Sequence, residues 1–230
     1  MKLIKYFTKT ELAIWISSVI VILTAFFVYD GEKYLNMIAS IIGTTALIFC
    51  AKGNPFGQVL IIIFASLYAY ISLSFRYYGE MITYLGMSLP MAVIALISWL
   101  KNPFKGSRAQ VKVNTISKKE LLFSFILSLV VTLIFYFILK ALGTANLVIS
   151  TVSITTSFFA AYLTFRRSEY FALAYTLNDI VLIIMWLMAM AKNVQYISVV
   201  ICFLVFLVND SYSYINWSRM KKRQRQTEQD

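Results

Sequence analysis

Residues 121–142 read LLFSFILSLVVTLIFYFILKAL, a largely apolar run with a single charge, Lys140, near its end. A helix of about 20 apolar residues crosses the roughly 30 Å hydrocarbon core of a bilayer, so this run predicts one transmembrane helix. Runs of similar length flank it, four before it and three after it: residues 11–29, 34–51, 56–75, 81–100, 147–165, 171–191 and 196–217. The predicted fold class is therefore an all-α polytopic membrane protein with eight transmembrane helices.

The basic residues lie in alternate gaps between these runs. Of the 21 Lys and Arg residues, 17 fall in the tails and gaps on one side of the predicted membrane. The other side receives only Lys33, Arg76, Lys140 and Lys192. An excess of Lys and Arg marks the cytoplasmic loops of membrane proteins. We therefore expect a multi-pass protein of the cell inner (cytoplasmic) membrane with both termini cytoplasmic.

The composition argues against several classes of protein. Hydrophobic residues make up 60% of the chain and charged residues 13%, whereas a soluble domain has about 25% charged residues. The net charge of +11 is explained by topology and by attraction of short loops and tails to anionic lipid, so no nucleic-acid partner is expected. The chain has no His, and its two cysteines, Cys50 and Cys202, fall in different runs, so we expect no metal site and no cofactor. A membrane-embedded enzyme would need clustered acids, His or an activated nucleophile, so no enzymatic activity is expected.

Two segments on either side of residues 121–142 follow the same plan. Residues 35–99 and 147–217 each begin with a span rich in small and hydroxylated residues, continue through two more spans and end on a Trp. Because three spans is an odd number, a single span must reverse the chain if both copies are to have the same orientation. We therefore predict one extra N-terminal helix plus two parallel triple-helix bundles joined by an inversion helix. The predicted divisions are an extra helix at 1–33, bundle 1 at 34–100, a basic cytoplasmic linker at 101–120, the inversion helix at 121–142, bundle 2 at 143–217 and a basic cytoplasmic tail at 218–230.

Polar residues inside the spans mark the predicted binding site, because ionisable groups in a membrane usually face the bundle interior or a water-filled cavity. Asn178 and Asp179 lie near the centre of the seventh span, and Asn209 lies in the second half of the eighth. Amides and aromatic rings on a shared helical face suit a small polar ligand with a flat, cationic ring. The predicted substrate-binding residues are Tyr175, Asn178, Asp179, Trp186, Asn209, Gln58 and Asn36.

Other polar and aromatic residues have two interpretations at this point. Ser, Thr and Asn side chains often join membrane helices to one another without binding a ligand. Asp210 either neutralises a bound cation or is solvated near the interface and paired with Arg219. Trp99 and Trp217, near span ends, fit the aromatic belt of a membrane interface. Glu80 falls in a loop on the less basic side, where it either anchors the interface or forms a gate.

Several motifs resemble the PnuC family of nicotinamide riboside transporters. In the first half these motifs are Gly53-Asn-Pro-Phe-Gly57, Leu67-Tyr-Ala-Tyr70, Tyr78-Gly-Glu-Met81, Pro90-Met91 and Trp99. In the second half the resemblance rests on Asn178 and Asn209. Many members carry a Trp-x-x-Trp pattern just ahead of the first of these Asn residues, where this chain has Phe171 and Ala174, and an Asp follows each Asn here.

The resemblance implies a SWEET-like fold and the uptake of nicotinamide riboside, an NAD precursor. It implies facilitated diffusion with alternating access of a central site between the two bundles. It also implies a functional link to a cytoplasmic nicotinamide riboside kinase, which traps the product by phosphorylation. Relatives with this architecture take thiamine or riboflavin, so a transporter of another vitamin precursor is the alternative. Whether the chain forms a homo-oligomer stays open.

Overall fold

The computed structural model describes residues 6–31, 34–74, 78–144, 146–191 and 194–229. It contains eight helical spans that are long and apolar enough to cross a membrane, which confirms the predicted fold class. The helices are α2 (Lys9–Ala25) with the π-helical turn η1 (Phe26–Asp30), α3 (Tyr34–Ala51), α4 (Phe56–Ser74), α5 (Tyr78–Thr83) with the π-helical turn η2 (Tyr84–Ser88) and α6 (Leu89–Lys101), α7 (Lys118–Ala141), α8 (Leu147–Phe165), α9 (Tyr170–Met190), and α10 (Ile197–Gln229) preceded by the short 3₁₀ helix η3 (Val194–Tyr196).

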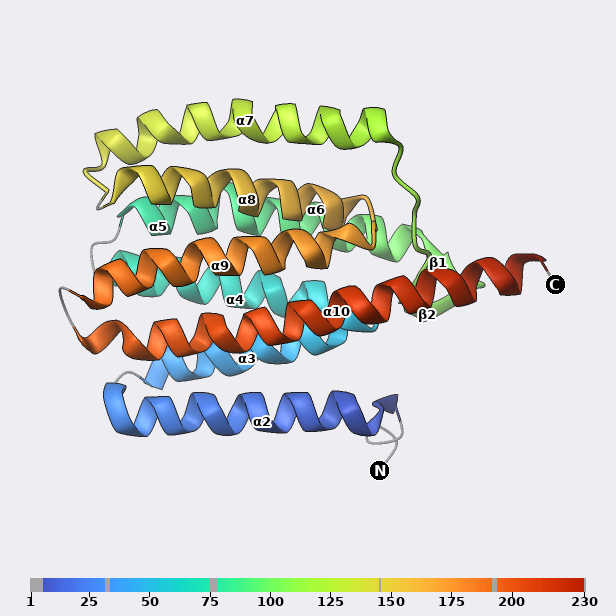
Figure 1. Cartoon of the computed structure of the whole chain (residues 1–230), viewed down its shortest axis with the longest axis horizontal. Coiled ribbons are helices and arrows are strands. Elements are labelled where there is room, and N and C mark those ends of the chain that lie inside the picture. Colours follow the sequence, from blue (N-terminus) through green and yellow to red (C-terminus); the bar gives the residue numbers. More distant parts are fainter. Residues whose placement is uncertain (1–5, 32–33, 75–77, 145, 192–193, 230) are drawn as a thin grey trace.

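Six of these helices form a closed ring. In order around the ring, α3 packs on α4, α4 on α6, α6 on α8, α8 on α9, α9 on α10, and α10 on α3. The ring order places α4 and α9 opposite each other. Of the two remaining spans, α2 packs outside the ring against α3 and α10, and α7 packs against α8 (Figure 1). The ring therefore consists of one three-helix group, α3–α4–α6, facing another, α8–α9–α10.

Helix α7, the predicted inversion helix, packs mainly on α8, through a face of small residues. Ser124, Ser128 and Thr132 follow the four-residue spacing of one helical face, and all three are buried. Their hydroxyls donate to carbonyls of their own helix, and Thr132 also hydrogen-bonds to Thr155 of α8 (2.8 Å). Small residues let two helices approach closely in a membrane. The other faces of α7 are apolar and exposed, as expected for contact with lipid.

The fourth span begins earlier than its hydrophobic run suggests. The helix starts at Tyr78 and not at residue 81, so Glu80 lies inside a span and its predicted position in a loop is wrong. The turn η2 follows in the same span, just ahead of Pro90. Because proline has no N–H for the usual helical hydrogen bond, a wider turn before it relieves the helix.

The two halves match residue by residue at their first turns. Gly53 and Arg167 both have positive φ, +66° and +56°, and both follow the first helix of their half. The N–H of Gly53 donates to the carbonyl of Cys50 (2.8 Å), and the N–H of Arg167 donates to the carbonyl of Thr164 (3.0 Å). A left-handed residue after the last turn is a common helix ending, which Gly adopts without strain. The connection from α3 to α4 has the same length as that from α8 to α9, so the register continues into the second helix of each half.

The linker joins both of these turns. It contains the antiparallel strands β1 (Pro103–Phe104) and β2 (Ser107–Val111). The N–H of Val111 donates to the carbonyl of Gly53, and the N–H of Asn114 donates to the carbonyl of Arg167, each at 2.9 Å. The predicted tail is helical, because α10 continues without a break to Gln229. Gln224 on this extension is buried and hydrogen-bonds to the linker at the carbonyl of Val111 and the N–H of Val113.

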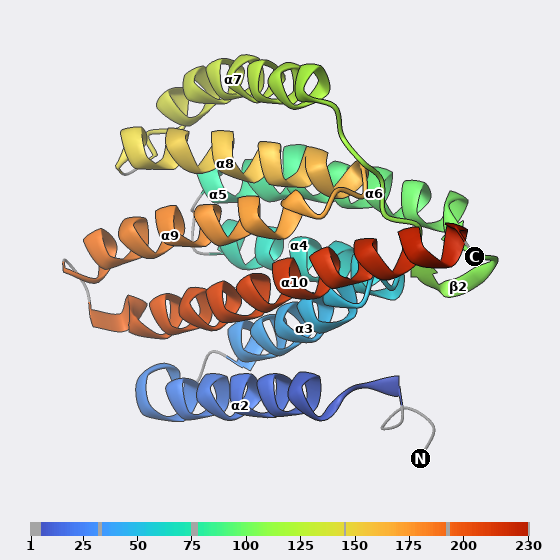
Figure 2. The same cartoon turned by 45° about the vertical axis from the view of Figure 1, so that its right-hand side comes forward.

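Both termini and the linker lie at one end of the molecule, here called the basic end (Figures 1 and 2). The last residues of α4, α7 and α9 lie at the opposite end. This arrangement agrees with the alternation of basic gaps along the sequence. The basic residues Lys2, Lys5, Lys33, Arg76 and Lys192 lie outside the described residues.

Candidate substrate-binding site

A cavity of about 150 Å³ lies inside the ring, lined by residues of all six ring helices and of α5, η2 and α7. Three of its lining residues are acidic: Glu80, Asp179 and Asp210. None of the described residues that line it is Lys or Arg. A cavity of this charge attracts a cation and disfavours an anion.

Asn178 of α9 has a fixed orientation in the cavity wall. It is buried, and its Oδ1 accepts hydrogen bonds from Thr156 Oγ1 (2.7 Å) and Ser157 Oγ (2.8 Å), both on α8. These two contacts tie the amide to α8 through its oxygen. The Nδ2 group has no partner among the described residues, so it is available as a donor to a ligand.

Asp179 of α9 and Asp210 of α10 form a buried acid pair. Each is 3% exposed, and the two carboxyl groups hydrogen-bond to each other. The Oδ2 atom of Asp179 has no hydrogen-bond partner among the described residues. Tyr175, one helical turn before Asp179 on α9, lines the same part of the cavity. The pair lies where two neighbouring helices of the second half present their cavity-facing residues.

The first half carries apolar residues at the matching positions. Asp179 follows Arg167 by the same interval as Ala65 follows Gly53, and Asp210 precedes Trp217 by the same interval as Ala92 precedes Trp99. Both Ala65 and Ala92 line the cavity. By the same correspondence, Phe64 stands where the second half has Asn178. The cavity therefore has one polar, acidic wall and one mainly apolar wall.

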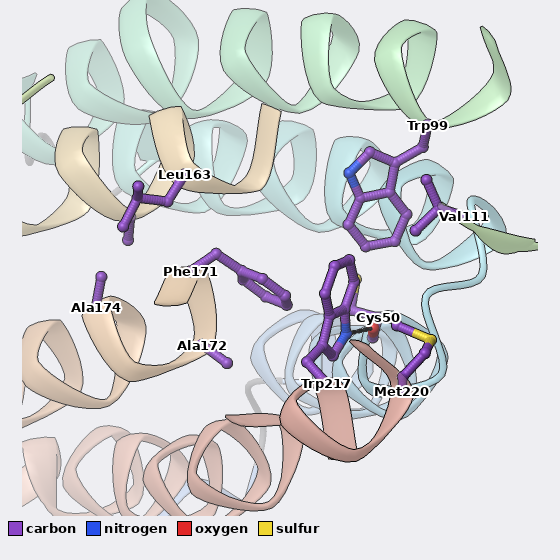
Figure 3. Packing of buried hydrophobic residues seen from close by; sticks show 10 residues of the cluster. Cys50, Trp99, Val111, Leu163, Phe171, Ala172, Ala174, Trp217 and Met220 are labelled. Carbon is purple, nitrogen blue, oxygen red and sulfur yellow. Dashed lines mark hydrogen bonds between the residues drawn. The ribbon is translucent and has the colours of Figure 1, made fainter. Parts of the chain in front are cut away.

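Two tryptophans pack beside the cavity lining, toward the basic end. Trp99 ends the first half and Trp217 ends the second; both are 0% exposed, and their ring centroids are 5.4 Å apart (Figure 3). Phe171, which also lines the cavity, meets the Trp217 ring edge-on with centroids 4.8 Å apart. The prediction that the two tryptophans belong to an interfacial aromatic belt is therefore wrong. Their spacing in the sequence matches span ends, but packing of one half on the other buries them.

The hydrogen bonds of this pair are reciprocal between the halves. Trp99 Nε1 donates to the carbonyl of Thr164, and Trp217 Nε1 donates to the carbonyl of Cys50, both at 2.8 Å. The residue before each Trp repeats the pattern on the next carbonyl: Ser98 Oγ donates to Phe165, and Asn216 Nδ2 donates to Ala51, both at 2.7 Å. We call the set Ser98, Trp99, Asn216 and Trp217 the tryptophan latch.

Arg167 supports the latch from the second turn. Its Nη1 donates to Ser98 Oγ (2.8 Å) and its Nε donates to the carbonyl of Lys112 (3.2 Å). Burial, and the neighbouring Arg166, lower the pKa of the Arg167 guanidinium. An arginine side chain has so high an ordinary pKa that it stays protonated in a protein. These contacts explain why an arginine occupies a left-handed position where the first half has Gly53.

Known proteins share this architecture. The sequence profile of the family described as "Nicotinamide mononucleotide transporter" matches residues 33–219. The chain belongs to this family. The match covers the six ring helices and α7, and so includes both the cavity and the latch.

Relatives and a solved structure of the family are named more specifically. The chain is 29% identical over 216 residues to the nicotinamide riboside transporter PnuC of Neisseria mucosa, covering 92% of this chain and 82% of that protein. It is 25% identical over 213 residues to the protein of the same name from Haemophilus influenzae, covering 91% and 90%. Its structure is similar to the crystal structure of the vitamin B3 transporter PnuC, with a TM-score of 0.82 at 26% identity, covering 95% and 94% of the two chains. The family and these relatives are transporters, not enzymes.

Four of the seven predicted substrate-binding residues of this chain line the cavity: Tyr175, Asn178, Asp179 and Gln58. The other three lie outside the lining. Asn209 is buried between α10 and α2, where its Nδ2 donates to Ser18 Oγ (3.0 Å). Trp186 packs against Tyr196 with centroids 5.3 Å apart, and Asn36 lies half-buried near the start of α3.

The predicted list of binding residues omits Asp210, for which neutralising a bound cation is one of two interpretations, and Glu80, which is predicted in a loop as an anchor or a gate. Asp210 does not pair with Arg219: nine residues of helix separate the two by about 14 Å, and Asp210 faces Asp179 instead. Asp210 follows Asn209 directly on α10. One residue turns the helix by about 100°, so Asn209 faces α2 while Asp210 faces the cavity. The sequence does not place Glu80 in a span, because the hydrophobic run starts after it.

Proposed function

We propose that this protein transports nicotinamide riboside across the membrane. The observation that carries the proposal is the cavity inside the six-helix ring, with an acidic, amide-bearing wall on one side and an apolar wall on the other. Nicotinamide riboside has a flat pyridinium cation, a carboxamide and a ribose. The Asn178 amide suits the polar groups, the acids suit the cation, and Phe64 offers an aromatic face to the ring. The names of the curated relatives point to the same substrate.

The charge of the cavity favours the riboside over the mononucleotide in the family description. A phosphate group would bring negative charge into a space lined by three acids and by no described Lys or Arg. Phosphate sites in proteins normally use Arg, Lys or a helix N-terminus to balance that charge. Thiamine is the second candidate, because it is also a ring cation of modest size and fits the same charge argument.

Binding to the purified protein tests the substrate. We expect nicotinamide riboside to bind at least about tenfold more tightly than nicotinamide mononucleotide, because like charges brought together in an interface cost several kcal/mol. Thiamine, riboflavin and free nicotinamide form the remaining arms of the titration. Equal or tighter binding of the mononucleotide would contradict the charge argument, and a preference for thiamine would transfer the function to the second candidate.

We propose alternating access as the mechanism, with the tryptophan latch as the closure on one side. The cavity lining reaches Cys50 and Thr164, whose carbonyls the two indoles hold, so separation of the latch residues would open the cavity toward the basic end. The two three-helix groups would then move as units, joined by α7, as bundles do in other repeat-built transporters. The residues at the opposite end, including Glu80, would close when the latch opens.

We further propose that transport is facilitated diffusion and that a cytoplasmic kinase traps the product. We place the protein in the inner membrane, with its basic end facing the cytoplasm. Uptake into vesicles without kinase should stop when the concentrations on the two sides are equal. Accumulation above that level, driven by a pH gradient or a membrane potential, would contradict facilitated diffusion. A reporter fused after residue 230 that is active only in the cytoplasm tests the orientation.

A further inference from the structure

The acid pair Asp179–Asp210 has a charge that follows from its geometry. A carboxylate only accepts hydrogen bonds, so two carboxyl groups that hydrogen-bond to each other hold at least one proton between them. The pair then carries at most one negative charge, and a bound cation favours the form that carries it. That charge is deeply buried, and no described Lys or Arg lines the cavity to balance it.

An unbalanced buried charge is costly, and a bound cation relieves the cost. The position of the pair restricts which part of a ligand meets it. Asp179 adjoins Asn178, whose Nδ2 has no partner among the described residues and so suits a hydrogen-bond acceptor of the ligand. The opposite wall carries Phe64 and Ile61. A flat cationic ring between these walls would place its charge beside the acids and its face against the aromatic side chain.

We infer that the Asp179–Asp210 pair is a charge filter, which selects an oxidised, cationic nicotinamide ring over a neutral ring of the same shape. The inference rests on the proposed function and adds the residues and the property by which the substrate is chosen. The first half has Ala65 and Ala92 at the matching positions, so the charge filter lies on one wall of the cavity only. The two acids have no matching acid pair among the described residues of the cavity lining.

Reduced nicotinamide riboside is the probe that isolates charge from shape. Its dihydropyridine ring is neutral, while its carboxamide and ribose are the same as in the oxidised form. Equilibrium binding of both compounds to the purified wild-type protein should show at least about a tenfold preference for the cation, since close charge pairs in binding sites are coupled by more than 1.4 kcal/mol. Equal affinity for the two forms would overturn the inference and leave the proposed function intact.

Asparagine substitutions test the single shared charge. Asp179→Asn or Asp210→Asn leaves one carboxylate that accepts a hydrogen bond from the new amide, so each single variant should keep the preference within about threefold of wild type. The double variant, Asp179→Asn with Asp210→Asn, has no charge left in the pair and should bind the two forms within about twofold of each other. A double variant that keeps the wild-type preference, or single variants that each lose it, would overturn the inference.

Glu80→Gln separates the pair from the third acid of the lining. It should lower the preference less than the double variant does, whereas a loss as large as that of the double variant would assign selection to the overall negative potential instead. Thermal unfolding of each variant reports whether it folds, and the wild-type comparison does not depend on any variant. If the wild-type protein binds neither form, the proposed substrate is wrong and the inference falls with it.

Discussion

The two three-helix groups of this protein are alike in their framework and unlike in their chemistry. The turns at Gly53 and Arg167 have the same backbone conformation, and the two tryptophans of the latch hydrogen-bond to matching carbonyls in each other's half. The cavity-facing residues differ, because the second half has Asn178, Asp179 and Asp210 where the first has Phe64, Ala65 and Ala92. The shared features hold the ring together, and the features that differ form a one-sided site.

This difference implies that matched substitutions should separate framework from site. A change to a framework residue and its counterpart should have the same effect in both halves. A change to a site residue should have an effect in the second half that its counterpart in the first half lacks. Three predictions test this, from the largest expected effect to the smallest.

Asn178→Ala should cause the largest change. It removes the Nδ2 donor and takes the acceptor away from the Ser157 hydroxyl, so we expect a loss of at least about tenfold in affinity for nicotinamide riboside. Phe64→Leu at the matching position should cost less than Asn178→Ala, because an apolar side chain stays in the wall and only the aromatic face toward the ring is lost. Titration of both variants checks this. An Asn178→Ala affinity within twofold of wild type would show that the amide does not contact the substrate.

Trp99→Phe and Trp217→Phe should have equal effects on stability. Each removes an indole N–H, one of the two donors to a buried carbonyl, and part of a fully buried ring, which together cost about 1–3 kcal/mol. In a Cys202→Ser background, each should also raise the reaction rate of buried Cys50 with a maleimide, since the latch covers this part of α3. Thermal unfolding and labelling measure the two effects. A large effect from one tryptophan with none from the other would contradict the reciprocal latch.

Gly53→Ala and Arg167→Gly test the two turns and should have the smallest effects. Gly53→Ala places a side chain at positive φ and close to Met220, so it should destabilise the protein by about 1–2 kcal/mol. Arg167→Gly relieves similar strain but removes the bonds to Ser98 and Lys112, so its net effect should stay within about 1 kcal/mol. Unfolding of both variants in the same detergent compares them. A stabilised Gly53→Ala would show that the turn does not need its left-handed residue.

The sequence predicts the framework well because periodicity and charge are local signals. The apolar run 121–142 and the alternating basic gaps are sufficient to predict the spans, and the two Trp endings reveal the repeat. The site is only partly predictable. Whether Asp210 or Asn209 faces the cavity depends on a rotation of one residue, which the span boundaries do not determine. The burial of Trp99 depends on a partner more than a hundred residues away, and no local pattern reports that contact.

A structure of the protein with nicotinamide riboside bound tests the central claim most directly. The account predicts that the ligand lies inside the six-helix ring, with an acceptor atom within about 3.2 Å of Asn178 Nδ2, its charged ring beside Asp179 and Asp210, and its face toward Phe64. A ligand bound outside the ring, or one whose polar groups contact only the first half, would contradict it.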